Sequence, residues 1–219
     1  GGRVGESFEA LSAATGIALP ATLRHLIGSG RSDYDDLGRT ALSALYDFEW
    51  LSAQRAGAVI AGWLNPVKQH GNVFLPFGRS GAGDAYCLVR LRGGEEGVAM
   101  VWRDRSASRL RYASFDHFVV AEYLAVFADL DLLDEDAGDP VACLRADVAK
   151  VADLLDPALQ GMLHGCLGKP PTGHPYRRGS TARSEMMLSL ISQDEEEALY
   201  ARVSIPEPLA FDVVARWEA

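Results

Sequence analysis

The sequence predicts an α+β fold, and the spacing of its apolar residues carries this prediction. Near the start of the chain, apolar residues recur with the period of about 3.6 that is typical of helices. Between residues 73 and 113 the period changes to about 2, as expected of strands, and from residue 114 helical spacing returns. Helices and strands that are segregated along the chain in this way indicate the α+β class.

Three helices are expected before the strands. Residues 7–15 form the first, and Gly16 ends it. Pro20 suits the first turn of the second helix, which closes at Gly28. Residues 49–64 have an apolar stripe at helical spacing and predict the third helix.

Four short segments rich in β-branched and aromatic residues follow. They cover residues 73–77, 85–91, 98–102 and 109–113. Short connections rich in glycine, serine and charged residues separate them, which predicts an antiparallel meander. The alternation within residues 85–91 indicates a sheet with one covered face and one partly wet face.

Helices are expected again after the meander. Ser114 is a suitable N-cap for a helix over residues 115–130. The acidic run that follows contains Gly138 and Pro140, which mark a boundary. We therefore predict two domains, residues 1–139 and residues 140–219.

The second predicted domain is expected to be a helical extension. Helices are predicted over residues 141–156, 157–167, 182–191, 194–203 and, near the end of the chain, 206–217, with a proline-rich loop over residues 169–181. The first of these helices carries an apolar stripe made of Leu144, Val148, Val151 and Leu155. Such a stripe has to be buried, so we expect the helices to pack on the first domain or to form a small bundle.

Composition indicates a cytoplasmic protein of ordinary globular type. Hydrophobic residues make up 48% and charged residues 23% of the 219 residues. No apolar run reaches the ~20 residues of a membrane span, so no membrane partner is expected. No leader is visible, although the first residues lack an initiator Met and leave a removed leader open. The cysteines (Cys87, Cys143 and Cys166) lack CxxC spacing, which favours a reducing compartment.

The net charge of −9 argues against direct nucleic-acid binding and would suit a basic protein partner. The charge is uneven, because residues 61–120 carry 8 basic and 5 acidic side chains whereas residues 121–219 carry 8 and 18. The acidic excess is either a set of solvated helix faces or a surface that meets a partner. The oligomeric state stays open.

A glycine cluster over residues 78–84 invites three interpretations. A phosphate-binding loop needs Gly-Lys-Ser/Thr before a helix, but here Asp84 and a predicted strand follow. A nucleophile elbow also needs a helix after the turn. The cluster is therefore predicted to be a hairpin turn, with structural roles for Gly78, Gly81, Gly83 and Asp84.

No catalytic or metal constellation stands out elsewhere. His164, Cys166 and His174 do not match a zinc spacing. An EF-hand loop opening at Asp129 or Asp134 would lack its closing Glu. We therefore expect no enzyme activity, no cofactor and no metal, and a domain that binds rather than catalyses.

Several segments together resemble the SMI1/KNR4 (SUKH) superfamily, over roughly residues 6–128. The first part resembles the opening of that family: a helix, then Thr-Gly-Ile, then Leu-Pro, then a second helix. The middle part resembles the family's centre, with an apolar strand, a glycine-rich turn that ends in Gly-Asp, and a strand that contains Tyr-Cys. The last part resembles the family's end, where a Ser-Phe pair starts the helix after the last strand. The residues that carry the resemblance are Gly16, Leu19, Pro20, Phe77, Gly78, Gly81, Gly83, Asp84, Trp102, Ser114 and Phe115.

The resemblance implies a curved, mostly antiparallel sheet with helices packed against it. It also implies an immunity protein that binds and neutralises a cognate bacterial polymorphic toxin, and the acidity favours a basic, nuclease-type toxin domain. The alternative is an intracellular scaffold or regulatory binding module of the same family. If a toxin is the partner, we expect its contacts at Asp129, Asp131, Asp134, Glu135, Asp136 and Trp102.

Overall fold

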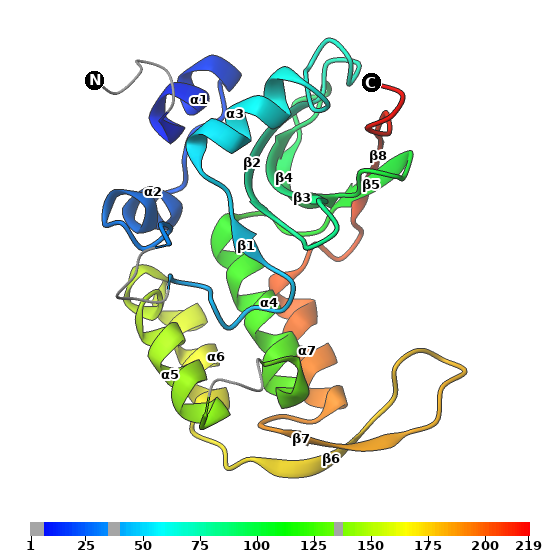
Figure 1. Ribbon diagram of the computed structural model, residues 1–219. Coiled ribbons are helices and arrows are strands. Elements are labelled where there is room, and N and C mark those ends of the chain that lie inside the picture. Colours follow the sequence, from blue (N-terminus) through cyan, green and yellow to red (C-terminus); the bar gives the residue numbers. More distant parts are fainter. Residues whose placement is uncertain (1–6, 35–39, 134–137) are drawn as a thin grey trace. The chain divides into compact units, whose positions relative to one another are not determined.

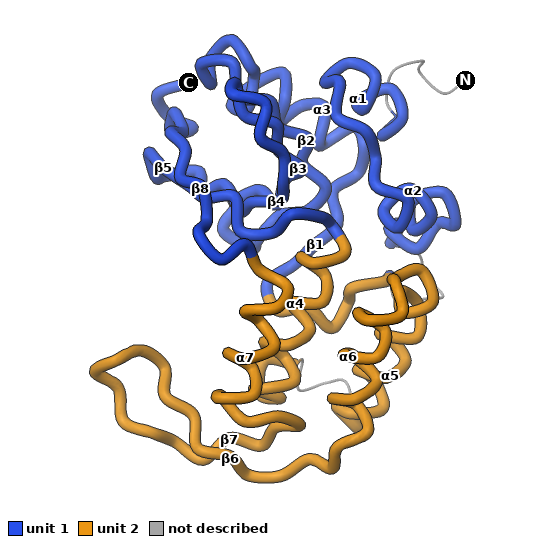
Figure 2. Tube along the Cα trace, turned by 180° about the vertical axis from the view of Figure 1, so that it is seen from behind, with its two compact units in different colours: residues 1–40, 47–115, 205–219 blue, residues 41–46, 116–204 orange. Residues whose placement is uncertain are grey.

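The computed structural model describes residues 7–34, 40–133 and 138–219. These residues contain seven α-helices and antiparallel sheets, so the predicted α+β class is confirmed. The chain divides into two compact units (Figure 2). Unit 1 comprises residues 1–40, 47–115 and 205–219, and unit 2 comprises residues 41–46 and 116–204. This division does not coincide with the predicted boundary after residue 139.

The first two predicted helices are confirmed in unit 1. Helix α1 (Phe8–Thr15) begins after Ser7, whose hydroxyl accepts a hydrogen bond from the Ala10 N–H, and ends at Gly16 with a φ of 72°. Helix α2 (Ala21–Gly28) follows Pro20, as predicted.

The third helix is shorter than predicted. Glu49–Trp50 form a strand, β1, and helix α3 (Ala53–Ala61) starts only after Ser52, whose hydroxyl accepts from the Arg55 N–H. The Trp50 N–H donates to the Tyr34 hydroxyl at 2.8 Å, and Trp50 pairs with Gly78 of the neighbouring strand. Partners far along the chain therefore override the helical spacing at the start of this segment.

A four-stranded antiparallel sheet forms the centre of unit 1 (Figure 1). Its order is β1-β2-β3-β4, with β2 at Val73–Arg79, β3 at Ala85–Arg90 and β4 at Glu96–Val101. The β2–β3 register shifts between Pro76 and Gly78, and an irregularity of this kind bends a strand. Helix α3 lies against β2, and α1 packs beside it.

The last predicted meander strand has a different partner from the one expected. Strand β5 (Ala107–Leu110) pairs along its length with β8 (Leu209–Asp212), and just beyond β5 the residue Tyr112 forms an isolated bridge to Val98 of β4. The helix predicted over residues 206–217 is therefore wrong in this part. Phe211 explains the strand, because its side chain is buried and its ring centroid lies 5.9 Å from that of Phe74.

The core of unit 1 combines helix, sheet and C-terminal residues. Its buried members are Trp63, Leu64, Phe74, Ala85, Cys87, Val89, Leu91, Ala99, Val101, Leu110, Phe211 and Val213. Residues more than a hundred positions apart therefore share one apolar interior. The thiol of Cys87 is buried in it, and burial raises the pKa of this thiol well above its ordinary value.

Unit 2 is mainly helical. Its helices are α4 (Phe115–Ala128, whose first residue belongs to unit 1), α5 (Pro140–Ala149), α6 (Pro157–Leu167) and α7 (Gln193–Val203), with short 3₁₀ turns at Leu130–Leu132 and Ala152–Leu154. The apolar stripe predicted from Leu144 to Leu155 is buried, as expected. Among the described residues, no helix is long and apolar enough to cross a membrane.

The predicted helical extension is wrong over residues 182–191. Glu185–Ser189 form strand β7, which pairs antiparallel with β6 (Thr172–Tyr176), a segment predicted to be a loop. The burial pattern explains the strand: Met187 is buried whereas Met186 and Leu188 are 70% and 49% exposed, which is a period of 2. The confirmed helix α7 starts directly after it at the capping box of Ser192 and Glu195.

A buried carboxylate ties the short segment 41–46 into unit 2. Asp147 of α5 is 2% exposed, and its oxygens accept hydrogen bonds from the Ala44 N–H at 3.1 Å and the Tyr123 hydroxyl at 2.8 Å. The Ser43 N–H donates to the same carboxylate at 3.3 Å. Burial raises the pKa of Asp147, and these hydrogen bonds oppose the shift.

We predict that Asp147→Ala lowers the free energy of unfolding by about 3 kcal/mol, because it leaves buried donors without an acceptor. Tyr123→Phe is the matched control, since it removes one of these hydrogen bonds and leaves the carboxylate in place, at a cost of about 1 kcal/mol. Urea unfolding of both variants measures the difference. Equal losses would mean that the contacts to segment 41–46 contribute nothing.

Candidate functional site

The glycine cluster forms a tight turn between β2 and β3. The Ser80 N–H donates to the Asp84 carbonyl at 2.9 Å, and the Gly83 N–H donates to the Ser80 carbonyl at 3.0 Å. The Asp84 carboxylate is buried and accepts from the Ser80 hydroxyl at 3.1 Å and from the Arg103 N–H at 3.0 Å. Asp84 therefore links this turn to the chain after β4 and has its oxygens engaged in the fold.

The three glycines of the cluster have different environments. Gly83 has a φ of 88°, which L-residues adopt at a cost. At Gly78 a Cβ would clash with the Phe48 ring, which packs edge-on against Trp50 at a centroid distance of 5.2 Å. The Gly81 N–H donates to the Asp47 carboxylate at 2.8 Å, and its φ is not positive.

We predict that Gly83→Ala lowers the free energy of unfolding by about 1–2 kcal/mol, because alanine is strained at this positive φ. Gly81→Ala is the control in the same turn, and a smaller loss is expected there. Thermal unfolding of the two variants makes the comparison. A Gly83→Ala protein as stable as the parent would contradict a conformational role.

The acidic residues predicted to contact a toxin have different environments. Asp129 is 2% exposed, accepts from the Asp131 N–H and pairs with Arg178 at 2.5 Å, so its side chain is engaged in the fold of unit 2. Asp131 is exposed. Asp134, Glu135 and Asp136 lie outside the described residues.

Trp102 belongs to unit 1 rather than to the unit that carries the acidic run. It is half-buried, and the Arg105 guanidinium lies 4.4 Å from the centroid of its ring. The structure therefore assigns the residues proposed for toxin contact to two separate units.

The net charge of the protein lies entirely in one unit. Unit 1 contains 14 basic and 14 acidic residues, whereas unit 2 contains 7 and 16. Part of the acidic excess is compensated within unit 2, where Glu195 pairs with Lys169 and Asp129 with Arg178. The remainder includes exposed carboxylates on the 3₁₀ turns, at the N-cap of α6 and on α7, namely Asp131, Asp153, Asp156, Asp194 and Glu197.

Two glutamates of unit 2 hold protons more tightly than usual. Burial raises the pKa of Glu122 on α4 from 4.5 to about 7. Burial also raises the pKa of Glu196 on α7 to about 7, with smaller contributions from Glu197 and Asp129 in the same direction and an opposing hydrogen bond from Tyr176. Unit 2 therefore gains negative charge between pH 5 and pH 8.

We predict that the protein loses stability as the pH rises from 5 to 8, because a carboxyl whose pKa is raised on folding stabilises the folded state only while it is protonated. The Glu122→Gln variant should lose less stability over this range and should exceed the parent at pH 8. Unfolding free energies at several pH values test this, with Glu185→Gln, at the exposed start of β7, as the control. Identical pH profiles for the parent and Glu122→Gln would contradict it.

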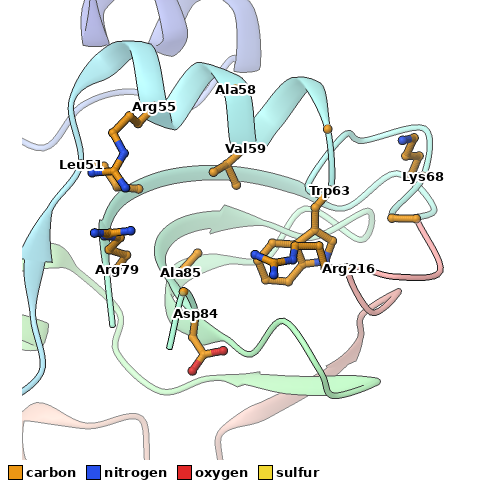
Figure 3. Close-up of a pocket in the computed structure, with 13 residues that line it drawn as sticks. Leu51, Arg55, Ala58, Val59, Trp63, Lys68, Arg79, Asp84, Ala85 and Arg216 are labelled. Atoms are coloured by element: carbon orange, nitrogen blue, oxygen red, sulfur yellow. The ribbon is translucent and has the colours of Figure 1, made fainter. Parts of the chain in front are cut away.

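Unit 1 contains a cavity of about 520 Å³ that the sequence did not predict (Figure 3). It lies between α3, the glycine turn that connects β2 to β3, and the C-terminal segment. Its apolar lining includes Leu51, Val59, Trp63 and Ala85. The charged side chains in its lining are those of Arg55, Lys68, Arg79, Arg216 and Asp84.

Cations outnumber carboxylates in this cavity. Arg79 pairs with Glu49 at 3.0 Å. Within the described part of the chain, Arg55, Lys68 and Arg216 form no ion pair. The basic excess of residues 61–120 is the signal in the sequence that points toward this site, but Arg55 and Arg216 lie outside that stretch.

The described residues contain no group of three His, Cys, Asp or Glu side chains that could hold a metal ion. They form an α+β architecture: an antiparallel sheet with a cation-lined cavity in one unit, and an acidic, mainly helical unit. The chain belongs to the SMI1/KNR4 family (SUKH-1), whose family model matches residues 5–121. That range spans α1 to the first half of α4 and leaves β8 outside. No curated protein and no solved structure matches the chain.

Proposed function

We propose that this protein is an immunity protein that binds and neutralises a cognate bacterial polymorphic toxin through a protein–protein interface. Membership of the SMI1/KNR4 family supports this proposal. The structural observation that best supports the proposal is that the whole net charge of −9 lies in unit 2. A strongly acidic unit suits a basic partner, such as a nuclease-type toxin domain, which it would occlude.

The electrostatics of unit 2 support a cationic partner in a second way. Glu196 lies near Glu197 and Asp129, and these like charges add to the rise in its pKa. A basic side chain docked beside α7 would relieve that repulsion and favour the ionised form of Glu196. Long-range attraction between the partners would also speed their association at low salt.

An intracellular scaffold or regulatory module of the same family is the alternative. Both functions depend on protein binding, so the partner distinguishes them. A large secreted protein with a variable C-terminal domain, encoded directly upstream, is the partner that the immunity function requires.

The deciding experiment is co-expression of this chain with that C-terminal domain. Growth should be rescued, and the two proteins should co-purify. Growth arrest in spite of soluble, folded protein would overturn the immunity function and favour the scaffold.

The interface is tested by reversing Asp131, Asp134 and Asp136 to Lys. We predict that the association rate with the toxin domain falls about tenfold at low salt, and that the difference shrinks at high salt because ions screen the attraction. The matched control reverses Glu95, Glu96 and Asp104, which are exposed on unit 1 and change the net charge equally. Equal rates for both triple variants would assign the acidic run to solubility and place the interface elsewhere.

A further inference from the structure

The cavity of unit 1 has no role in the proposed toxin binding, which rests on unit 2. We propose that it binds a small organic anion that carries acidic groups at both ends of an apolar body. The volume, about 520 Å³, lies within the range of small-molecule sites. This inference is independent of the immunity function.

The charges of the cavity indicate an anionic ligand. Its single acidic lining residue, Asp84, accepts from Ser80 with one carboxylate oxygen and from Arg103 with the other. Arg55, Lys68 and Arg216 face the cavity without a carboxylate partner among the residues that the structure describes. Three uncompensated cations around a concave surface attract an anion, because the protein walls focus their field.

The cations occupy two ends of the cavity (Figure 3). Arg55 from α3 and Arg79 from the end of β2 lie together at one end, near Leu51. Lys68 and Arg216 lie toward the other end, on the side of Trp63. A compact anion such as phosphate carries its charge in one place, so cations at two ends favour a ligand with two separated acidic groups.

The surface between the two ends is apolar. Val59, Trp63 and Ala85 contribute to it, and Ala58 extends it along α3. A hydrocarbon or aromatic body placed there would leave water and add to the binding free energy. The cavity therefore favours an organic dianion over an inorganic one.

Several hydrogen bonds hold the walls in place. The Trp63 indole N–H donates to the Val214 carbonyl at 2.9 Å, and the Gln69 amide donates to the Trp63 carbonyl at 2.9 Å. The Arg216 N–H donates to the Arg103 carbonyl at 2.8 Å. Glu49 fixes the Arg79 guanidinium, so this side chain needs little ordering when a ligand binds.

The test is calorimetric titration of the full chain with α,ω-dicarboxylates of four to twelve carbons. Monocarboxylates of the same lengths and inorganic phosphate serve as comparison ligands at matched ionic strength. We expect saturable binding with an optimum chain length, at least tenfold weaker binding of the matching monocarboxylate, and weaker binding still of phosphate. Absence of saturable binding below about 10 mM for every dicarboxylate would overturn the proposal.

Variants at the two ends locate the site. Arg55→Gln and Arg216→Gln should each weaken the optimal dicarboxylate about tenfold while hardly affecting the monocarboxylate bound at the opposite end. Arg109→Gln, on the exposed side of β5, is the matched control, and its affinity should equal that of the parent. All three residues are exposed, so the variants should fold, and urea unfolding checks this. Equal affinities for the three variants would place the binding outside the cavity.

Discussion

The pairing of β5 with β8 is the interaction on which unit 1 depends. It brings residues 205–219 back to a sheet formed by residues 49–101. Phe211 and Val213 enter the apolar core, and the Val214 carbonyl accepts hydrogen bonds from Trp63 and Gln69. Without this return the core would lose two apolar side chains, and buried donors would lose their acceptor. The cavity would also lose the wall that carries Arg216. The segment that completes the unit lies outside the range matched by the family model.

The two units present different binding chemistry. Unit 1 has balanced charge overall, but it gathers basic side chains around one apolar hollow. Unit 2 carries the acidic excess and includes glutamates whose pKa values are raised to about 7. Attraction of a basic protein is a long-range effect of many exposed carboxylates, whereas the cavity acts at short range through a few cations. The two proposed sites therefore differ in the size and in the charge of the ligand that suits each.

The candidate sites could be predicted from the sequence to different degrees. The turn at residues 78–84 follows from local chemistry, since glycine-rich connections between short strands form hairpins. The role of Asp129 does not follow from local chemistry. It is one acid in an acidic run, and only the folded chain shows that it is buried and paired with Arg178, 49 positions later. The cavity has no local signal either, because Arg55, Arg79 and Arg216 come from a helix, a strand and the C-terminal segment.

The sequence by itself determined the fold class, the helices that have strong caps and the order of the central strands, because caps, turns and apolar periods act between near neighbours. It also identified the family. The tertiary structure decided that residues 185–189 and 209–212 are strands, because each segment is too short to select its own conformation. Strand β7 takes its conformation from the pairing with β6, and β8 from the pairing with β5. A ladder stabilises a strand only through a partner, and that partner is brought to its place by the rest of the chain.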